Sequence, residues 1–130
     1  MVLVNRPSEK EKSNKIREAI SAIESGKRII PMSKHFASDQ EDLGIKDSKN
    51  LWELLLVFLR EIEDLEPRRC YVGGRPPKKS YELEVAGKEL WAYSWQSISM
   101  NKKMYIKFCL VGGYYFYVGC HKDNLKGATR

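Results

Sequence analysis

Residues 103–120 read KMYIKFCLVGGYYFYVGC, and their pattern predicts the central hairpin of a β-sheet. Lys103 to Val111 alternate between two sets of side chains, which predicts a strand with one face toward a core. The side chains expected in that core are Met104, Ile106, Phe108 and Leu110. Gly112-Gly113 predicts a hairpin turn, and Tyr114 to Cys120 predicts a second strand antiparallel to the first.

Strand-like periodicity extends upstream of this hairpin. Leu90 to Ser97 predicts another strand, and residues 81–85 alternate in the same way. Arg68 to Val72 is a candidate edge strand. Residues 73–79 are expected to form a loop, because their two prolines disfavour helix and central strand pairing. The sequence therefore predicts an antiparallel sheet of four to five strands.

The N-terminal half has helical periodicity instead. Residues 8–25 carry apolar side chains at helical spacing, with a capping serine at the start and a glycine just beyond the end. Residues 27–31 predict a short extended stretch, and residues 33–42 predict a brief helix. The strongest pattern starts at Asp47 or Ser48 and runs to about residue 64, where a wide apolar stripe predicts the central packing helix.

These elements predict an α+β fold, with two or three N-terminal helices packed on one face of the sheet. The 130 residues are expected to form one domain, with a helical part over about 8–65, a sheet over about 68–121 and a frayed tail at 122–130. The longest apolar run is far shorter than the roughly 20 residues of a membrane span. With no signal-peptide pattern at the start, we expect a cytoplasmic protein without membrane contact.

Positive charge and aromatic rings are concentrated in the second half of the chain. Pro67 to Arg130 holds twelve Lys or Arg against four Asp or Glu, whereas Met1 to Glu66 holds eleven against thirteen. All seven tyrosines and two of the three tryptophans lie in the basic half. Cations and flat rings at alternating positions suit a polyanion with stackable bases. The same pattern also suits a plain sheet whose outer face uses lysine for solubility and tyrosine for β propensity.

Two structural questions stay open at this point. Both alternating sets of the strand at 90–97 contain residues that favour burial, so the facing of its tryptophans is undecided, and at least one is expected to be structural. A two-residue Gly112-Gly113 turn places Tyr105 opposite Cys120. A one-residue bulge, plausible at Gly119, or a three-residue turn places Tyr105 beside His121 instead.

With Tyr105 beside His121, the outer face would carry groups suited to RNA cleavage without a metal. That reaction needs a base for the ribose 2′-OH, cations for the charge on phosphorus and an acid for the leaving 5′ oxygen. Histidine titrates near neutrality, and tyrosine or lysine can share these roles when neighbouring cations shift the pKa. Tyr105 and His121 are the candidates for proton transfer. Lys79, Lys103 and Lys107 are expected to position the phosphate or stabilise its charge. The residues expected to bind RNA nearby are Arg75, Lys78, Tyr93 and Trp95, the last two by stacking.

No metal and no cofactor are expected. His35 and His121 are the only histidines, which disfavours a His-based metal site. The three cysteines form no C-x-x-C pair and are expected to be small apolar fillers.

Several short strings point to a known family. They are Ile23-Glu-Ser-Gly26, Leu43-Gly44-Ile45, the helix from Leu51 to Leu59, Trp91-Ala-Tyr93 and Tyr105-Ile-Lys107. In this order, over about residues 15–122, they resemble the RelE-like toxin superfamily, and within it the motility quorum-sensing regulator (MqsR) type of mRNA interferase.

The resemblance implies a RelE-like fold and cleavage of single-stranded or ribosome-associated mRNA without a metal. It also implies a cognate antitoxin as partner. The family's site uses a lysine before the sheet's second strand, a polar residue after a tryptophan, a tyrosine, and a basic residue ending the last strand. By position these roles fall on Lys79 or Lys78, Tyr93 or Gln96, Tyr105, and His121. The tryptophan is either Trp95, which precedes Gln96, or Trp91, which fits the spacing to Tyr105.

Three functions are therefore weighed. The first is a metal-independent endoribonuclease toxin of a toxin–antitoxin pair, acting by 2′-OH attack. The second is a non-catalytic nucleic-acid-binding domain that uses the same face. The third is a protein-interaction domain, such as an immunity or adaptor protein, because aromatic and arginine side chains also favour protein interfaces.

Overall fold

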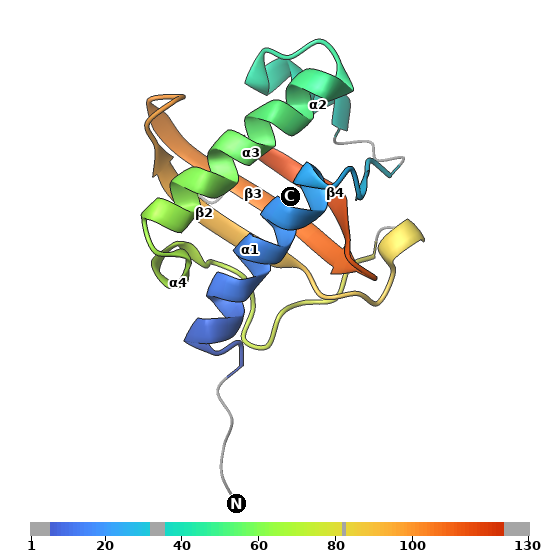
Figure 1. Cartoon of the computed structure of the whole chain (residues 1–130), viewed down its shortest axis with the longest axis vertical. Coiled ribbons are helices and arrows are strands. Elements are labelled where there is room, and N and C mark those ends of the chain that lie inside the picture. The colour runs from blue at the N-terminus through green and yellow to red at the C-terminus, as the bar shows by residue number, and fades with distance from the viewer. Residues whose placement is uncertain (1–5, 32–35, 82, 124–130) are drawn as a thin grey trace, which may run out of the picture.

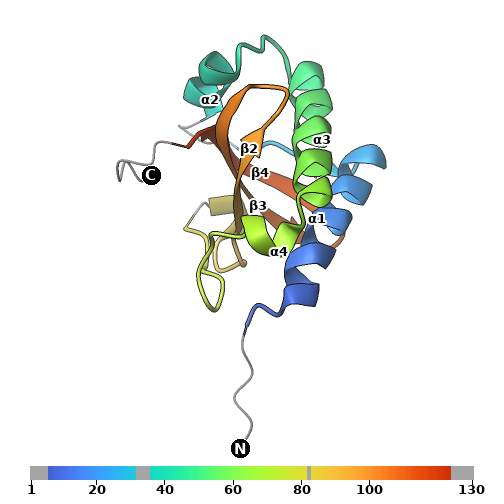
Figure 2. The ribbon, with the colours of Figure 1, turned by 90° about the vertical axis from the view of Figure 1, so that its left-hand side faces the viewer.

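The computed structural model describes residues 6–31, 36–81 and 83–123, and it has the predicted α+β architecture. Helices α1 (Glu9–Glu24) and α3 (Ser48–Asp64) lie side by side on one face of the sheet (Figures 1 and 2). Helix α2 (Phe36–Leu43) packs beside strand β4. Within the described ranges, none of the helices has both the length and the apolar composition that a membrane span requires.

The ends of the two long helices follow the capping signals in the sequence. Ser8 and Glu11 form a reciprocal capping box at the start of α1, and the Asp47 carboxylate accepts a hydrogen bond from the Asn50 backbone at the start of α3. Gly26 follows α1 with a φ of 76°, a conformation that glycine adopts without strain. Both helices are thus confirmed to within a residue or two. The predicted helix at 33–42 corresponds to α2, although residues 33–35 lie outside the described ranges.

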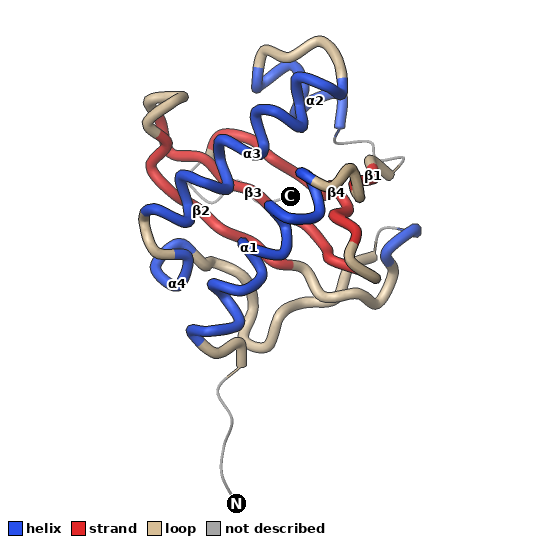
Figure 3. Tube along the Cα trace, in the orientation of Figure 1, coloured by secondary structure: helices blue, strands red, loops and turns tan. Residues whose placement is uncertain are grey.

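The sheet is mixed, not purely antiparallel as predicted. Its strands are β1 (Arg28–Ile29), β2 (Trp91–Ser97), β3 (Lys102–Val111) and β4 (Tyr114–Lys122), in the spatial order β1-β4-β3-β2 (Figure 3). The last three form an antiparallel meander, but β1 pairs in parallel with β4. A parallel pair needs a long connection, and here α2, α3 and two strands separate its members.

Two predicted strands upstream of β2 are not formed. Pro67 starts a short helix, α4 (Pro67–Cys70), where an edge strand was expected, because proline fits the first turn of a helix and has no N–H for a strand ladder. Residues 83–85 form a 3-10 turn, η1 (Leu83–Val85), in place of the predicted strand at 81–85. Tyr81 is fully exposed, so its alternation with the following residues does not mark a buried face.

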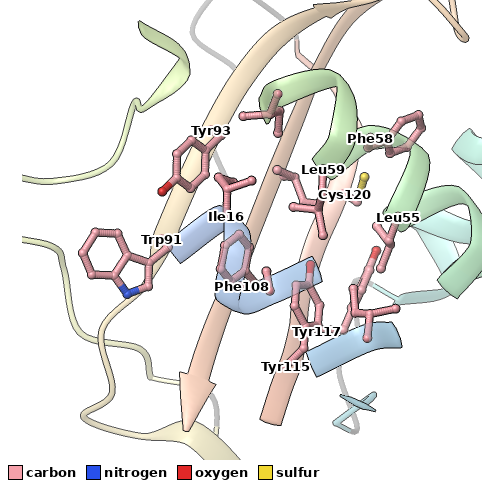
Figure 4. Packing of buried hydrophobic residues seen from close by; sticks show 14 of the residues in the cluster. Ile16, Leu55, Phe58, Leu59, Trp91, Tyr93, Phe108, Tyr115, Tyr117 and Cys120 are labelled. Atoms are coloured by element: carbon pink, nitrogen blue, oxygen red, sulfur yellow. The ribbon is translucent and has the colours of Figure 1, made fainter. Parts of the chain in front are cut away.

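The main core lies between the helices and the sheet (Figure 4). Helix α3 contributes Leu51, Leu55, Phe58, Leu59 and Ile62, all at 0% exposure. From the sheet come Met104, Ile106 and Phe108 of β3, as predicted, and the large rings of β2 and β4. A smaller apolar cluster lies on the opposite face, where Val85 of η1 packs against Cys109 and Val118. The segment around η1 thus covers part of that face, as the edge-on view in Figure 2 shows.

The β3–β4 hairpin resolves the open question of register. Gly112 and Gly113 form the tight turn, with φ of 57° and 81°. Pairing is regular from the turn as far as Phe108 with Tyr117, and the next pair is Lys107 with Gly119. Val118 is the extra residue, so a one-residue bulge is present, one position before the predicted Gly119.

Glu61 on α3 ties the helix layer to the end of β2. One carboxylate oxygen accepts hydrogen bonds from Trp95 Nε1 at 2.9 Å and Ser97 Oγ at 2.7 Å, and the other accepts from the Ser99 backbone N–H at 2.9 Å. Partial burial acts to raise the pKa of this carboxyl, but the hydrogen bonds from Trp95, Ser97 and Ser99 together hold it below its ordinary value.

Two neighbouring tyrosines of β4 differ in how their buried hydroxyls are satisfied. Tyr117 donates to the buried Asp39 carboxylate at 2.6 Å, and the same oxygen accepts from the Cys120 backbone N–H at 3.1 Å. The Tyr115 hydroxyl is also buried, but it has no hydrogen-bond partner among the described atoms. Asp39 therefore joins α2 to β4, the strand that carries His121.

Candidate active site

Tyr105 and His121 form the centre of the candidate site. They are paired across β3 and β4, and their ring centroids lie 5.1 Å apart with the planes tilted by 31°. Both side chains are partly exposed. Met104 and Ile106, the sequence neighbours of Tyr105, point into the helix-side core, so Tyr105 and its partner lie on the opposite face.

The backbone orients the imidazole of His121. Its Nδ1 atom lies 2.7 Å from the carbonyl oxygen of Lys122. Because a carbonyl oxygen only accepts hydrogen bonds, Nδ1 carries the hydrogen in this contact. In the neutral imidazole Nε2 is then the nitrogen with the lone pair, so this atom can take a proton and later return it.

Two lysines flank Tyr105 on the same face. Lys103 precedes it by two positions on β3 and Lys107 follows it by two, so strand alternation directs all three side chains to one side. Lys103 is exposed and Lys107 is half-buried. On β2, the exposed Gln96 pairs with Lys103. The fold thus brings together five predicted site residues, which are Gln96, Lys103, Tyr105, Lys107 and His121.

The same surface contains Ser94 and Asp123, which sequence reasoning missed. Ser94 on β2 pairs with Tyr105, and its hydroxyl donates a hydrogen bond to the Asp123 carboxylate. The Asp123 backbone N–H donates to the Lys103 carbonyl at 3.0 Å, which extends the β3–β4 pairing by one residue. The sequence predicts a frayed tail at Asp123, and a lone serine in a strand carries no functional signal. Only the position of Ser94 opposite Tyr105 could have drawn attention to it.

Tyr93 and Trp95 do not belong to this surface, contrary to the expectation that their rings stack on bases. They are 0% and 2% exposed and lie in the core on the helix side of β2. The Tyr93 hydroxyl donates to the Lys12 carbonyl at 2.7 Å, and burial raises its pKa well above the ordinary range. Large rings fill the deep layer under the helices, whereas the open face of β2 has Ala92, Ser94 and Gln96.

The predicted loop cations come from a different segment than the Tyr105–His121 pair. The exposed side chains of Arg75, Lys78 and Lys79 lie on the segment that precedes β2 in the chain and runs beside its first residues. The backbone of Lys79 pairs with that of Glu89 in an isolated antiparallel β-bridge, and the Glu89 carboxylate contacts Arg6 near the start of α1 at 3.3 Å. Antiparallel partners point to the same face, so Lys79 lies on the helix side of the sheet. The structure therefore does not bring Lys79 together with Tyr105 and His121.

Residues with metal-ligating side chains are dispersed. In the described part of the chain no three His, Cys, Asp or Glu side chains are grouped so that they could hold a metal ion. Cys70, Cys109 and Cys120 are buried thiols that form no disulfide. The candidate site itself holds the hydroxyls of Ser94 and Tyr105, the His121 imidazole, the Asp123 carboxylate and the ammonium groups of two lysines.

Comparison with protein-family models, curated proteins and solved structures finds no match to this chain.

Proposed function

We propose that the chain is an endoribonuclease that cleaves single-stranded RNA with its own side chains. The observation that carries this proposal is the pairing of Tyr105 with His121, at 5.1 Å between ring centroids, on a sheet face that also holds Lys103 and Lys107. Rings at this separation can both contact one phosphodiester. The two lysines supply positive charge beside it.

In the proposed reaction, His121 Nε2 takes the proton of the ribose 2′-OH, and the 2′ oxygen attacks the adjacent phosphorus. A new P–O2′ bond forms while the P–O5′ bond breaks, and the departing 5′ oxygen takes a proton from the Tyr105 hydroxyl. The products are a 2′,3′-cyclic phosphate and a 5′-hydroxyl end. Lys103 and Lys107 stabilise the extra negative charge that phosphorus carries during the attack.

The resemblance to the RelE-like toxin superfamily supports the same activity. It adds two expectations to the proposal: the substrate is mRNA, free or on the ribosome, and a cognate antitoxin binds the protein and blocks cleavage. The cytoplasmic location expected from the start of the sequence fits such a substrate. The neighbouring reading frame is the place to look for that antitoxin.

The test is incubation of the purified protein with a long single-stranded RNA in EDTA, followed by analysis of the fragment ends. We expect cyclic-phosphate or 3′-phosphate ends. The substitutions Tyr105→Phe and His121→Ala should each lower turnover by roughly 10²- to 10⁴-fold, with RNA binding largely kept. Tyr114→Phe is the matched control, because Tyr114 is an exposed tyrosine at the start of β4, next to the hairpin turn.

Two outcomes would overturn the proposal. If a variant that combines Tyr105→Phe with His121→Ala releases the same fragments as the unmodified protein, the cleavage does not come from this pair. If RNA stays intact but is retarded at low salt, the face is a binding surface, and affinity should then fall with salt at a log–log slope of about −0.7 per neutralised phosphate.

A further inference from the structure

The contact between Ser94 and Asp123 spans the candidate site. Strands β2, β3 and β4 are neighbours in the sheet, with β3 in the middle. Ser94 lies on β2, and Asp123 directly follows β4. The hydrogen bond between their side chains therefore passes over β3 on the open face, beside Tyr105, which is the direct partner of Ser94.

This contact brings a carboxylate into an otherwise cationic surface. Lys103 and Lys107 lie on the same face of β3, and Asp123 is one of only four acidic residues after Pro67. A carboxylate and a phosphodiester accept hydrogen bonds from hydroxyl groups in the same way, and both are attracted by ammonium groups. The Asp123 carboxylate thus has the chemistry of a phosphate and lies where the proposed reaction needs one.

We infer that Asp123 occupies a phosphate subsite of the RNA site, and that Ser94 is a phosphate-binding residue of that subsite. This inference rests on the proposed RNA-binding function of the open face. An RNA phosphate displaces the carboxylate, takes the hydrogen bond from the Ser94 hydroxyl and gains the attraction of Lys103. The Asp123 carboxylate is then a built-in competitor that weakens binding of any anion to the resting protein.

The experiment measures binding of a fluorescent 2′-O-methyl single-stranded RNA, which cannot be cleaved by 2′-OH attack, by anisotropy at low salt. Asp123→Asn keeps an acceptor for Ser94 but removes the charge. We expect it to bind this RNA about fivefold more tightly, the factor for removing one repulsive charge about 4 Å from a phosphate in water. Asp64→Asn is the matched control, because it makes the same change in net charge at an exposed position in the last turn of α3, on the other side of the sheet. It should alter affinity by less than about twofold, because a distant exposed charge is largely screened.

A second variant tests the role of Ser94. In the Asp123→Asn background, Ser94→Ala should weaken RNA binding by about tenfold to a hundredfold, the usual value of a hydrogen bond to a charged group. In the unmodified background the same substitution should change affinity less, because two effects oppose each other. The phosphate loses the hydrogen bond from Ser94, but it also displaces the Asp123 carboxylate more easily once that carboxylate has lost its serine partner. A clear coupling between the two positions supports the inference.

Equal effects of Asp123→Asn and Asp64→Asn would overturn the inference, since net charge alone would then explain both. Should Asp123→Asn unfold, the unmodified protein is titrated with a 2′-O-methyl dinucleotide and followed by NMR. Shifts at the Ser94 and Asp123 amides support the subsite, and unshifted amides at both overturn it.

These results are separable from the cleavage test. RNA that is bound more tightly by Asp123→Asn but never cleaved removes the catalytic proposal and keeps the subsite. If RNA is cleaved through Tyr105 and His121 but Asp123→Asn and Asp64→Asn bind it equally well, the catalytic proposal is kept and the subsite is removed.

Discussion

Replacing Glu61 with glutamine should lower the free energy of unfolding by about 3 kcal/mol at neutral pH. The magnitude follows from the three hydrogen bonds that the carboxylate accepts, two at one oxygen from Trp95 and Ser97 and one at the other from the Ser99 N–H. Glutamine has one acceptor oxygen, so one of these donors would face an NH₂ group. The remaining bonds would lose their charge, which is worth about 1 kcal/mol each.

The effect should depend on pH in a defined direction. Because the hydrogen bonds hold the folded-state pKa of Glu61 below its ordinary value of 4.5, the carboxylate's contribution to stability is complete above that value. This contribution is lost as the pH falls through the lower folded-state pKa. Below that pH the carboxyl is protonated in the folded protein and in the unfolded chain alike. The difference between the native protein and Glu61→Gln should therefore be complete at about pH 7 and shrink as the pH falls below 4.5.

Urea unfolding across this pH range measures both quantities, and a thermal melt at neutral pH should show a fall of about 10 °C. Glu63→Gln is the control, because Glu63 is exposed on the same helix and should change stability by less than about 0.5 kcal/mol. Parallel pH profiles for the native protein and Glu61→Gln would refute the reasoning, because the lost stability would then not come from the carboxylate's charge.

Three further predictions concern β4 and the core. Tyr117→Phe should destabilise by about 2 kcal/mol because it removes a donor to buried Asp39, whereas Tyr115→Phe should stabilise by about 1 kcal/mol because it removes a buried hydroxyl without a partner among the described atoms. Urea unfolding of the two variants side by side checks this, and equal effects would contradict it. Stability should fall as the pH rises above 10, the ordinary pKa of tyrosine, because burial raises the pKa values of Tyr93, Tyr115 and Tyr117 and the unfolded chain ionises first. Circular dichroism against pH follows this loss, and an unchanged signal well above pH 10 would count against it. Gly113→Ala should cost about 1 kcal/mol in urea unfolding, because alanine is strained at a φ of 81°; an unaltered midpoint would mean that the turn relaxes.

Elements with a strong local signal were predictable from the sequence. The apolar stripe and the caps defined α1 and α3, and the alternation after Lys103 placed Met104, Ile106 and Phe108 in the core. The segment between α3 and β2 was not predictable in this way. Its alternation at 81–85 is a local coincidence, and its structure depends on Val85 meeting Cys109 of a distant strand.

The candidate site was predictable in part for the same reason. Alternation placed Lys103, Tyr105 and Lys107 on one face, but it left open whether Tyr105 pairs with Cys120 or, through a bulge or a longer turn, with His121. Which side of β2 faces the helices depends on whether its aromatic side chains fill the space beneath them. That is decided by packing and not by the alternation of the sequence. The parallel partner of β4 and the reach of Asp123 to Ser94 involve residues far apart in the chain, for which no local pattern exists.

The bulge on β4 also determines which changes of chain length the site would survive. Val118 is the residue without a partner, so a chain from which its codon had been deleted would still pair Tyr105 with His121, now in an unbroken ladder. That shorter chain would lose an apolar side chain that packs with Val85 and Cys109. Val118 is thus an additional residue that packs against Val85 and leaves the register of the paired rings unchanged.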